Sequence, residues 1–297
     1  MAKFIIQPHG RLQEWIAHEN GYFTDEGLEY EIPSSDVSQR PKKMNEQSGK
    51  VAEIKSGAYE SYVRGSGNKG NKSDISCACH WAVNQAAAQN VGKMWGKAYV
   101  VTPGAVMVRA DSDIRKPDDL AGREVAVGYH SGSHFTTIQA LEAFLDPDDI
   151  KLKFVGLPWQ RVDVGLDGDV EATSVWGITY QACEQLGMRR IADTSFMIGF
   201  MFPNSVDEAD VEKYMNGLKQ AQMDLDLEPE KYKHFYLKGI PERYREKLDV
   251  RLFSSGERIV FLPYSEVTFA KTQEWIQERG IFKDMPESYD YEEAVAG

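Results

Sequence analysis

Residues 117–135 read PDDLAGREVAVGYHSGSHF, and this stretch combines a turn, a strand and the start of a helix. The segment 117–123 has the composition of a turn with a short helix. The apolar run 124–128 is of the kind that forms a buried strand. Ser131-Gly132-Ser133-His134 then opens a helix that we expect to reach about Leu145. The stretch therefore predicts a buried strand that leads into the N-terminus of a helix.

Strands and helices alternate on both sides of this stretch. Residues 4–7 and 28–32 read as strands, and Leu12, Trp15 and Ile16 recur at helical spacing between them. The other expected strands are 74–76, 98–102, 105–108, 152–157, 172–175 and 190–192. The helices expected after residue 206 are 207–225, 229–235, 242–248 and 264–279. This alternation predicts an α/β protein with a parallel sheet flanked by helices.

The composition narrows the classes of partner. The chain has 297 residues, of which 42% are apolar and 27% charged, as in folded globular proteins. Its length fits two domains or one large domain. The 46 acidic residues outnumber the 34 basic residues, which gives a net charge of −12. Nucleic-acid-binding proteins need a basic face, and a membrane span needs about 20 apolar residues. We therefore expect no nucleic-acid partner and no membrane span.

The N-terminus and the cysteines bear on the compartment. The chain enters its first expected strand directly after Met-Ala-Lys3, with no apolar stretch and cleavage site before it. Cys77, Cys79 and Cys183 are three cysteines that cannot all pair, and free thiols suit a reducing compartment. We therefore expect a cytoplasmic protein. The alternative is a periplasmic or lipid-anchored protein whose leader has been removed.

Four motifs in order resemble one family. They are Gly21-Tyr22-Phe23 with Glu26-Gly27-Leu28, the segment 118–127, the run from Ser131 to Phe135, and Leu166-Asp167-Gly168-Asp169-Val170-Glu171-Ala172 with Val175-Trp176 and Tyr180. Together they resemble the solute-binding proteins for sulfonates, nitrate and taurine. The relatives of those proteins include the pyrimidine synthase of fungal thiamine biosynthesis and aromatic sulfinate desulfinases.

The resemblance implies a two-lobed type II periplasmic-binding fold. Mixed sheets flanked by helices would form each lobe, and the ligand would bind in the cleft between the lobes. We expect the chain to cross between lobes near residues 102–106 and 199–203. Lobe one would then comprise residues 1–103 plus 204–297, and lobe two residues 104–203.

The run Ser131, Gly132, Ser133 and His134 is the clearest candidate for ligand binding. Exposed N–H groups at a helix start attract anions, and the resemblance places the ligand at this turn. The alternative is ordinary N-capping.

Cys77-Ala78-Cys79-His80-Trp81 concentrates two thiols, an imidazole and an indole after a short strand. A thiol at a helix N-terminus has a lowered pKa and is a better nucleophile, and His80 beside it can transfer protons. We therefore predict catalytic roles for Cys77, Cys79 and His80, with Trp81 against the ligand. The alternative is two buried small side chains and one satisfied histidine. The spacing lacks the second ligand pair of a zinc site, so we expect no metal and no cofactor.

Four further residues complete the predicted site. His9 follows the first strand, where the resemblance places ligand contacts, and we predict a catalytic role for it. Arg64 can bind a carboxylate or sulfinate with two hydrogen bonds, although a surface arginine is an equal alternative. Trp176 and Tyr180 can form aromatic walls for an apolar ligand body, and core packing is the alternative.

Two functions fit these observations. The first is a cytoplasmic enzyme of lyase or hydrolase type, which cleaves a bond in a small carboxylate- or sulfinate-bearing compound with cysteine and histidine participation. The second is the substrate-binding component of an ABC importer for a small organic anion, which would need an importer permease as its partner. A cytoplasmic ligand sensor is a weaker third hypothesis.

Overall fold

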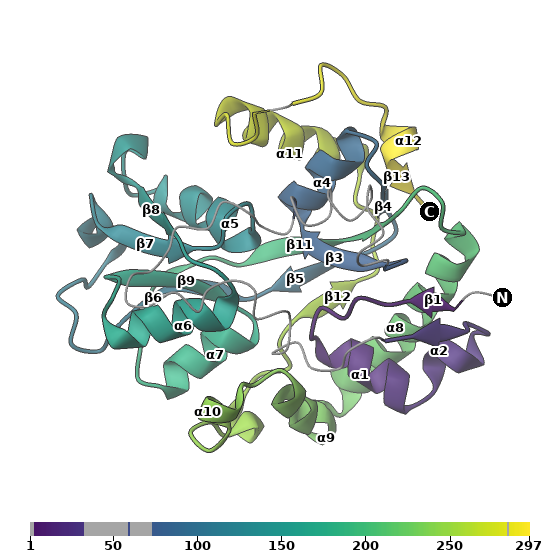
Figure 1. Cartoon of the computed structure of the whole chain (residues 1–297), viewed down its shortest axis with the longest axis horizontal. Coiled ribbons are helices and arrows are strands. Elements are labelled where there is room, and N and C mark those ends of the chain that lie inside the picture. The colour runs from purple at the N-terminus through teal and green to yellow at the C-terminus, as the bar shows by residue number, and fades with distance from the viewer. Residues whose placement is uncertain (1–2, 33–58, 60–72, 284) are drawn as a thin grey trace.

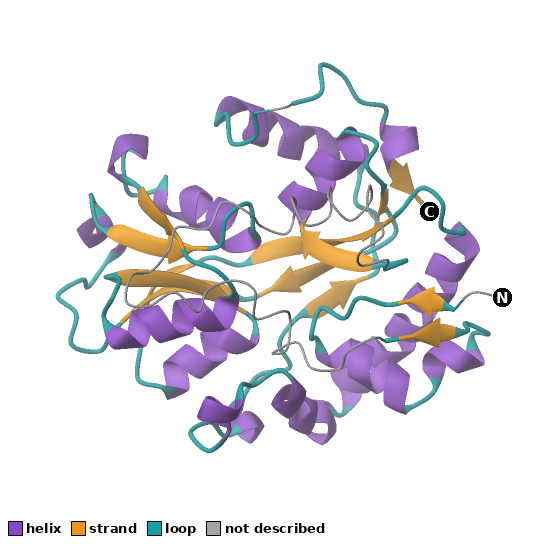
Figure 2. Cartoon of the chain, viewed as in Figure 1, coloured by secondary structure: helices purple, strands orange, loops and turns teal. Residues whose placement is uncertain are grey.

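The strands form two larger sheets and one small one (Figures 1 and 2). The computed structural model describes residues 3–32, 59, 73–283 and 285–297. The small sheet pairs β1 (Phe4–Ile5) with β2 (Tyr30–Glu31) in parallel. Ile6 continues this edge through a parallel bridge to Ile75. Ile75 directly precedes a strand of a larger sheet that begins at Ser76. The bridge therefore places the first segment of the chain beside that sheet.

The first larger sheet has the order β10-β6-β9-β7-β8. Its strands are β6 (Gly104–Val108), β7 (Glu124–Val127), β8 (Lys151–Phe154), β9 (Ala172–Trp176) and β10 (Arg189–Asp193). β7 runs parallel to β8 and β9, whereas β6 is antiparallel to β9 and β10. The helices connecting these strands are α5 (Gly132–Leu141), α6 (Pro158–Asp167) and α7 (Ile178–Gln185). The sheet is therefore mixed, as the resemblance implied.

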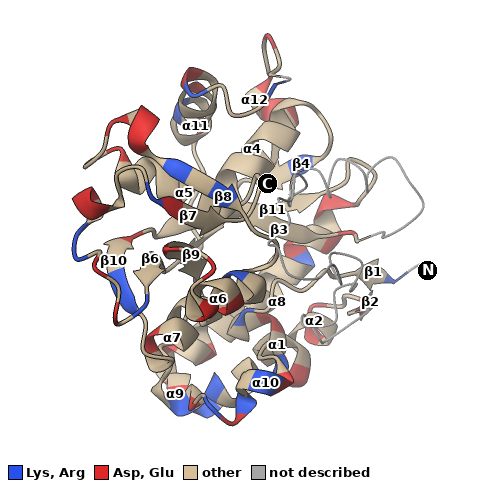
Figure 3. Cartoon of the chain, turned by 60° about the vertical axis from the view of Figure 1, so that its left-hand side comes forward, with Lys and Arg blue, Asp and Glu red and all other residues tan. Residues whose placement is uncertain are grey.

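The second larger sheet has the order β12-β5-β11-β4-β13, with β3 also paired to β11. Its strands are β3 (Ser76–Cys79), β4 (Lys93–Trp95), β5 (Tyr99–Thr102), β11 (Phe196–Phe202), β12 (Arg258–Val260) and β13 (Val295–Ala296). Its central strand β11 carries no charged residue and is almost completely buried. In Figure 3 the acidic and basic residues lie mainly on the outer helices and loops.

The remaining α-helices of the described residues lie outside the connections of the first larger sheet. They are α1 (Leu12–Glu19), α2 (Tyr22–Asp25), α4 (His80–Ala88), α8 (Glu208–Leu227), α9 (Pro229–Tyr232), α10 (Glu242–Arg245), α11 (Glu266–Glu278) and α12 (Tyr291–Ala294). Of these, α4, α8 and α12 contact strands of the second sheet. α1 forms because Leu12, Trp15 and Ile16 share one buried face, and the chain turns after it at Gly21, whose φ is +80°. α2 and α8 are joined by the stacked rings of Phe23 and Tyr214, whose centroids are 5.2 Å apart.

The chain passes between the two larger sheets at two short connections. Pro103 joins β5 to β6, and residues 194–195 join β10 to β11. The second crossing therefore precedes the one expected at 199–203, because residues 199–202 belong to β11. The reason is that residues 196–202 form one continuous apolar strand that pairs with β3, β4 and β5. The lobe limits, 1–103 plus 204–297 and 104–203, stay a prediction.

Close packing joins α5 to the second crossing. A Cβ atom on Gly132, the first residue of α5, would overlap the ring of Phe196 at the start of β11. Thr136 Oγ1 also donates a hydrogen bond to the Thr194 carbonyl oxygen at 2.9 Å. The helix start that the sequence singled out is thus held against the connection between the sheets.

We expect Gly132→Ala to lower the free energy of unfolding by about 1–3 kcal/mol, because the added methyl group overpacks against Phe196. The measurement is urea unfolding followed by circular dichroism. Phe196→Leu in the same chain should recover part of the loss. Gly239→Ala is the control, since its Cβ would have no neighbour nearer than 3.7 Å. Equal effects at the two glycines would contradict the expectation.

Candidate functional site

His9 and Trp176 bring the loop before α1 into contact with the first larger sheet. His9 lies between β1 and α1, and Trp176 is the last residue of β9. Their rings stack with centroids 5.2 Å apart and planes 20° apart. Trp176 also meets Phe196 edge-on at 6.0 Å. Two residues predicted for the site from distant parts of the sequence therefore lie in direct contact.

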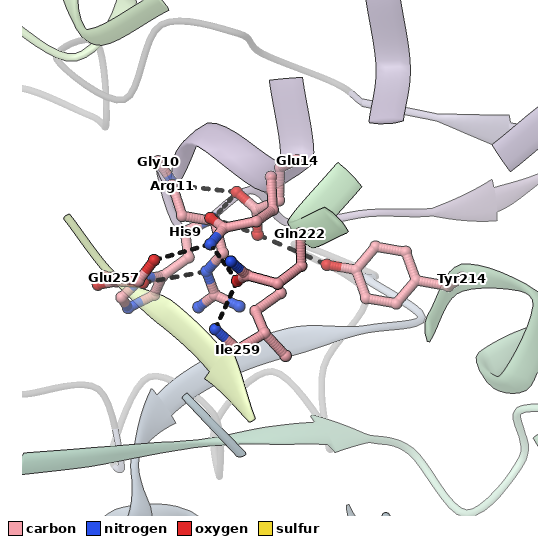
Figure 4. Close-up of polar contacts among 9 residues, drawn as sticks. His9, Gly10, Arg11, Glu14, Tyr214, Gln222, Glu257 and Ile259 are labelled. Atoms are coloured by element: carbon pink, nitrogen blue, oxygen red, sulfur yellow. Dashed lines mark hydrogen bonds and ion pairs between the residues drawn. The ribbon is translucent and has the colours of Figure 1, made fainter. Parts of the chain in front are cut away.

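Glu257 binds His9 and Arg11 on the other side of this contact (Figure 4). Its Oε1 lies 3.4 Å from His9 Nδ1, and its Oε2 accepts a hydrogen bond from Arg11 Nε at 3.0 Å. Burial works to raise the pKa of Glu257, but His9 and Arg11 lower it to about 2. Burial works to lower the pKa of Arg11, while Cys77, Glu257 and Glu14 raise it above its ordinary value. Both groups are therefore charged at neutral pH.

Glu14 shapes the loop that carries His9. Its carboxylate accepts hydrogen bonds from the backbone N–H of His9 at 2.8 Å and of Gly10 at 3.0 Å. Gly10 has a φ of +97°, which favours glycine at this turn. The loop is therefore fixed by one carboxylate at the start of α1, and His9 is held towards Trp176.

A second pair of hydrogen bonds positions Glu257. Gln13 Nε2 donates to the Glu257 carbonyl oxygen at 2.7 Å and to Gln222 Oε1 at 2.8 Å. Gln222 Oε1 also accepts from the Ile259 N–H at 2.8 Å. α1, α8 and β12 are thereby linked behind the charged residues, as Figure 4 shows.

Several buried donors at this junction have no hydrogen-bond partner among the described residues. They are Arg11 Nη1 and Nη2, Thr102 Oγ1 and Thr194 Oγ1. Thr102 and Thr194 flank the two crossings between the sheets. A Cβ on Gly177 would lie 3.8 Å from Thr102 Oγ1 and 3.9 Å from Glu257 Oε1. Buried polar atoms are nearly always hydrogen-bonded in native proteins, so these atoms mark a place suited to a polar ligand or to water.

The segment Cys77 to His80 differs from the expected loop at a helix N-terminus. Cys77 and Cys79 lie in strand β3, which pairs with β11, and α4 begins only at His80. Burial raises the pKa of each thiol to about 12, against the opposing effect of Arg11 on Cys77. The expected lowering of a thiol pKa is therefore wrong: at neutral pH both thiols are protonated and are weak nucleophiles.

His80 is buried and hydrogen-bonded to Tyr264. Its Nδ1 lies 2.9 Å from Tyr264 Oη, and burial lowers its pKa to about 3. The neutral imidazole therefore predominates at physiological pH, which makes it a poor proton carrier there. Catalytic roles for Cys77, Cys79 and His80 stay predictions, and these pKa directions argue against them.

Trp81 packs in an aromatic cluster between α4 and α5. Its ring centroid lies 5.4 Å from Phe135, 5.6 Å from Trp275 and 6.2 Å from Phe196. A shallow depression of about 250 Å³ lies beside it and is lined by His80, Trp81, Val101, Gln139, Ser195, Phe196 and Met197. The starts of α4 and α5 thus approach one another, with aromatic rings filling the space between them.

The hydroxyls of the serine turn (Ser131, Gly132 and Ser133) hold the turn itself. Ser133 Oγ accepts from the Gly128 N–H at 2.9 Å, and Ser131 Oγ donates to the Gly128 carbonyl at 2.8 Å. The two hydroxyl oxygens are 2.9 Å apart. His134 is buried and meets Phe154 edge-on at 5.0 Å. Anion binding at this turn stays a prediction, with the backbone rather than the hydroxyls as its available donors.

Tyr180, a predicted ligand-binding residue, is not brought to the junction. Tyr180 Oη donates to Glu184 on its own helix at 3.0 Å, and its side chain is partly exposed. Arg64 lies outside the described residues. Sequence analysis also missed Arg11 and Glu257. Arg11 precedes the apolar face of α1 and gives a weak signal, whereas no local pattern links it to a glutamate 246 positions away.

The described part of the chain shows neither a cluster of metal-ligating side chains nor a helix suited to cross a membrane. It contains no group of three or more histidine, cysteine, aspartate or glutamate residues arranged to hold a metal ion. None of the helices found there has the length and apolar content needed to cross a bilayer.

We expect His80 to make stability depend on pH. An unfolded histidine has a pKa near 6.5, whereas folding lowers that of His80 to about 3. Between these values the unfolded chain binds the extra proton, so stability falls as pH falls. From pH 6.5 to 5 the loss should be about 2 kcal/mol, and urea unfolding measures it.

His80→Gln should abolish most of this loss, while His18→Gln, which changes an exposed histidine, should not. Titration of Glu257 does not contribute above pH 5. Folding lowers the pKa of its carboxyl from 4.5 to about 2, so the stability that this group contributes is lost only as pH falls from 4.5 towards 2. The same slope in both histidine variants would contradict the assignment.

No protein-family model matches the chain, and no curated protein matches it in sequence. Solved structures do match its fold. The alkanesulfonate-binding protein SsuA from Xanthomonas axonopodis pv. citri, bound to MOPS, gives a TM-score of 0.68 at 16% identity, over 100% of this chain and 99% of that chain. The periplasmic aliphatic sulphonate binding protein SsuA from Escherichia coli gives 0.63 at 18% identity, over 98% and 96%.

The desulfurization enzyme DSZB gives a TM-score of 0.60 at 13% identity, over 100% of this chain and 96% of that chain. Binding proteins and an enzyme therefore share this architecture, and the similarity at such identities concerns the fold. The predicted fold class is confirmed: the chain has the periplasmic-binding-protein fold, with mixed sheets flanked by helices.

Proposed function

We propose that this protein binds a small organic oxyanion, of the sulfonate, sulfinate or carboxylate class, between its two larger sheets. The observation that carries the proposal is the Arg11 guanidinium. It is fully buried, and its Nη1 and Nη2 have no hydrogen-bond partner among the described residues. A guanidinium offers two parallel N–H donors to such an oxyanion, and a bound oxygen would satisfy donors that otherwise cost free energy.

The surroundings of Arg11 suit the rest of such a ligand. Thr102 and Thr194 add unpartnered hydroxyls from the two crossings. The stacked His9 and Trp176 rings present an apolar face, and aromatic faces favour an apolar or aromatic ligand body. Because His9 lies on the loop before α1 and Trp176 ends β9 of the first larger sheet, their contact would also close the site over a bound molecule.

The second candidate function is catalysis on such a compound. The observation in its favour is the His9–Glu257 pair, since a carboxylate that orients one imidazole nitrogen leaves the other suited to proton transfer. The protonated thiols of Cys77 and Cys79 argue against a thiolate step. We therefore place binding first and an enzyme of lyase or hydrolase type, with His9 as its proton carrier, second.

Calorimetry with a panel of methanesulfonate, benzenesulfonate, benzenesulfinate and benzoate tests the binding proposal. We expect at least one acid to bind with a Kd below about 1 mM. Arg11→Met should weaken that binding about tenfold or more, because a charge-assisted hydrogen bond contributes about 1.5–3 kcal/mol. Arg258→Met is the matched control, since Arg258 lies beside Glu257 and pairs with Asp226 at the surface. Binding of none of the four acids, or equal losses in both variants, would refute the proposal.

Proton NMR of the bound acid over a day separates the two candidates. A binding protein returns the ligand unchanged, whereas an enzyme converts it, and His9→Gln should then slow the conversion at least about 100-fold. Cell fractionation distinguishes a cytoplasmic enzyme from a periplasmic component that delivers its ligand to a permease. Conversion that survives His9→Gln would exclude His9 as the proton carrier.

A further inference from the structure

Arg161 is a buried cation that the site described above does not use. It lies on α6, its residue is 1% exposed, and it is among the largest fully buried side chains. Its Nε donates to the Ser174 carbonyl at 3.0 Å, and its Nη1 donates to the Gly156 carbonyl at 2.7 Å. Within the described part of the chain, no carboxylate forms an ion pair with it. Burial lowers its pKa to about 10, so it remains charged at neutral pH.

The guanidinium lies at the carboxyl ends of β7 and β8 and beside the middle of β9. Gly128 follows β7, Gly156 follows β8 after one residue, and Ser174 belongs to β9. β7 is parallel to both β8 and β9. Ligands of open α/β sheets bind outside the carboxyl ends of such strands. The position of Arg161 is therefore where this sheet would present a ligand site.

Arg161 also lies directly behind the serine turn. A Cβ on Gly128 would be 2.9 Å from Arg161 Nη1 and 2.6 Å from Ser131 Oγ, so these two atoms are close neighbours. The backbone N–H groups at the start of α5 lie on the same turn. Beside them, Ser174 Oγ is buried and has no hydrogen-bond partner within the described residues. The turn thus combines a helix start, an unused hydroxyl and a buried positive charge.

The missing counter-charge calls for an explanation. Burying an ion without a partner is costly, and carbonyl dipoles offset only part of that cost. The chain has 46 acidic residues, and two of them lie near Arg161 in the sequence of α6. Asp163 pairs with Arg243, and Asp167 is exposed to solvent, so neither neutralises Arg161. An anion that binds at the serine turn would supply the negative charge.

We propose that Arg161 is the counter-charge for the acid group of the ligand, and that it makes the site select an anion over a neutral molecule of the same shape. The inference rests on the proposed function and deepens it. Arg161 acts from behind the turn, by charge attraction through a poorly polarisable interior, while Arg11 and the backbone of the serine turn donate to the anion itself. It is a specificity-determining residue that sequence analysis did not find.

Selectivity measures this role. For the wild type we compare the Kd of benzenesulfonate with that of methyl phenyl sulfone, and the Kd of benzoate with that of benzamide. Arg161→Met should reduce the preference for the acid over its neutral counterpart by about tenfold or more. Lys153→Met removes the same charge from the outside of β8, where Lys153 pairs with Glu124, and should leave the preference unchanged. A loss that is equal for acid and neutral ligand would show a merely structural role and overturn the inference.

A second experiment needs no ligand and does not require Arg161→Met to fold. Ser131→Asp places a carboxylate beside Arg161, and Ser131→Asn is its uncharged match. Asp and Asn are similar N-caps, so Ser265→Asp and Ser265→Asn at the start of α11 measure the general effect of charge at a helix start. At each position we take the Tm of the Asp variant minus the Tm of the Asn variant. We expect this difference to be larger at position 131 than at position 265 by about 2 °C or more. No excess at 131 would overturn the inference.

The outcomes separate the two proposals. If the wild type binds none of the four acids, the proposed function fails, and the Tm comparison alone decides whether Arg161 awaits a negative charge. If acids bind with Arg11-dependent affinity but the preference survives Arg161→Met, the proposed function stands and the role of Arg161 is refuted. Ser131→Asp should also abolish acid binding where Ser131→Asn retains it, and binding by both with equal Kd would count against Arg161.

Discussion

The site depends on one buried carboxylate, that of Glu257. It holds His9 and Arg11, residues of the first loop, from a position beside β12 near the other end of the chain. Without it Arg11 would be a buried cation with no ion pair, a situation that costs several kcal/mol. His9 would also lose the partner that turns it towards Trp176. The contact of the first loop with β9 therefore follows from an ion pair that spans almost the whole sequence.

Two buried cations lack full compensation of their charge, one at the start of α1 and one on α6. Arg11 uses only Nε for its ion pair, and Arg161 has carbonyl partners alone among the described residues. The net charge of the chain is −12, so this local excess of donors runs against the overall balance. Local donors rather than net charge govern what a buried site attracts. This contrast favours an anionic ligand for a protein that repels anions at long range.

The sequence specified the local elements better than the interior of the site. The alternation around residues 117–135 was sufficient to predict the strand β7 and the start of α5. His9 and Trp176 were predicted for the site because His9 follows the first strand and Trp176 ends another, and the structure brings their rings together. The pKa values of the Cys77 and Cys79 thiols were misjudged because a four-residue strand of small side chains shows no alternation of polarity from which its burial can be predicted. Arg161 was missed because an arginine within an amphipathic helix usually reaches solvent, and only tertiary packing shows that it does not.

The five-stranded sheet is formed by one uninterrupted stretch of the chain, from Gly104 to Asp193. The two ends of that stretch are neighbours, because Ala105 pairs with Asp193 across β6 and β10. The chain therefore enters and leaves this segment at adjacent points, as is common where one domain is inserted into another. A substitution within this stretch therefore changes the surroundings of Arg161 and leaves the Arg11–Glu257 pair in place, provided that Trp176 and Gly132 keep their contacts with the rest of the chain.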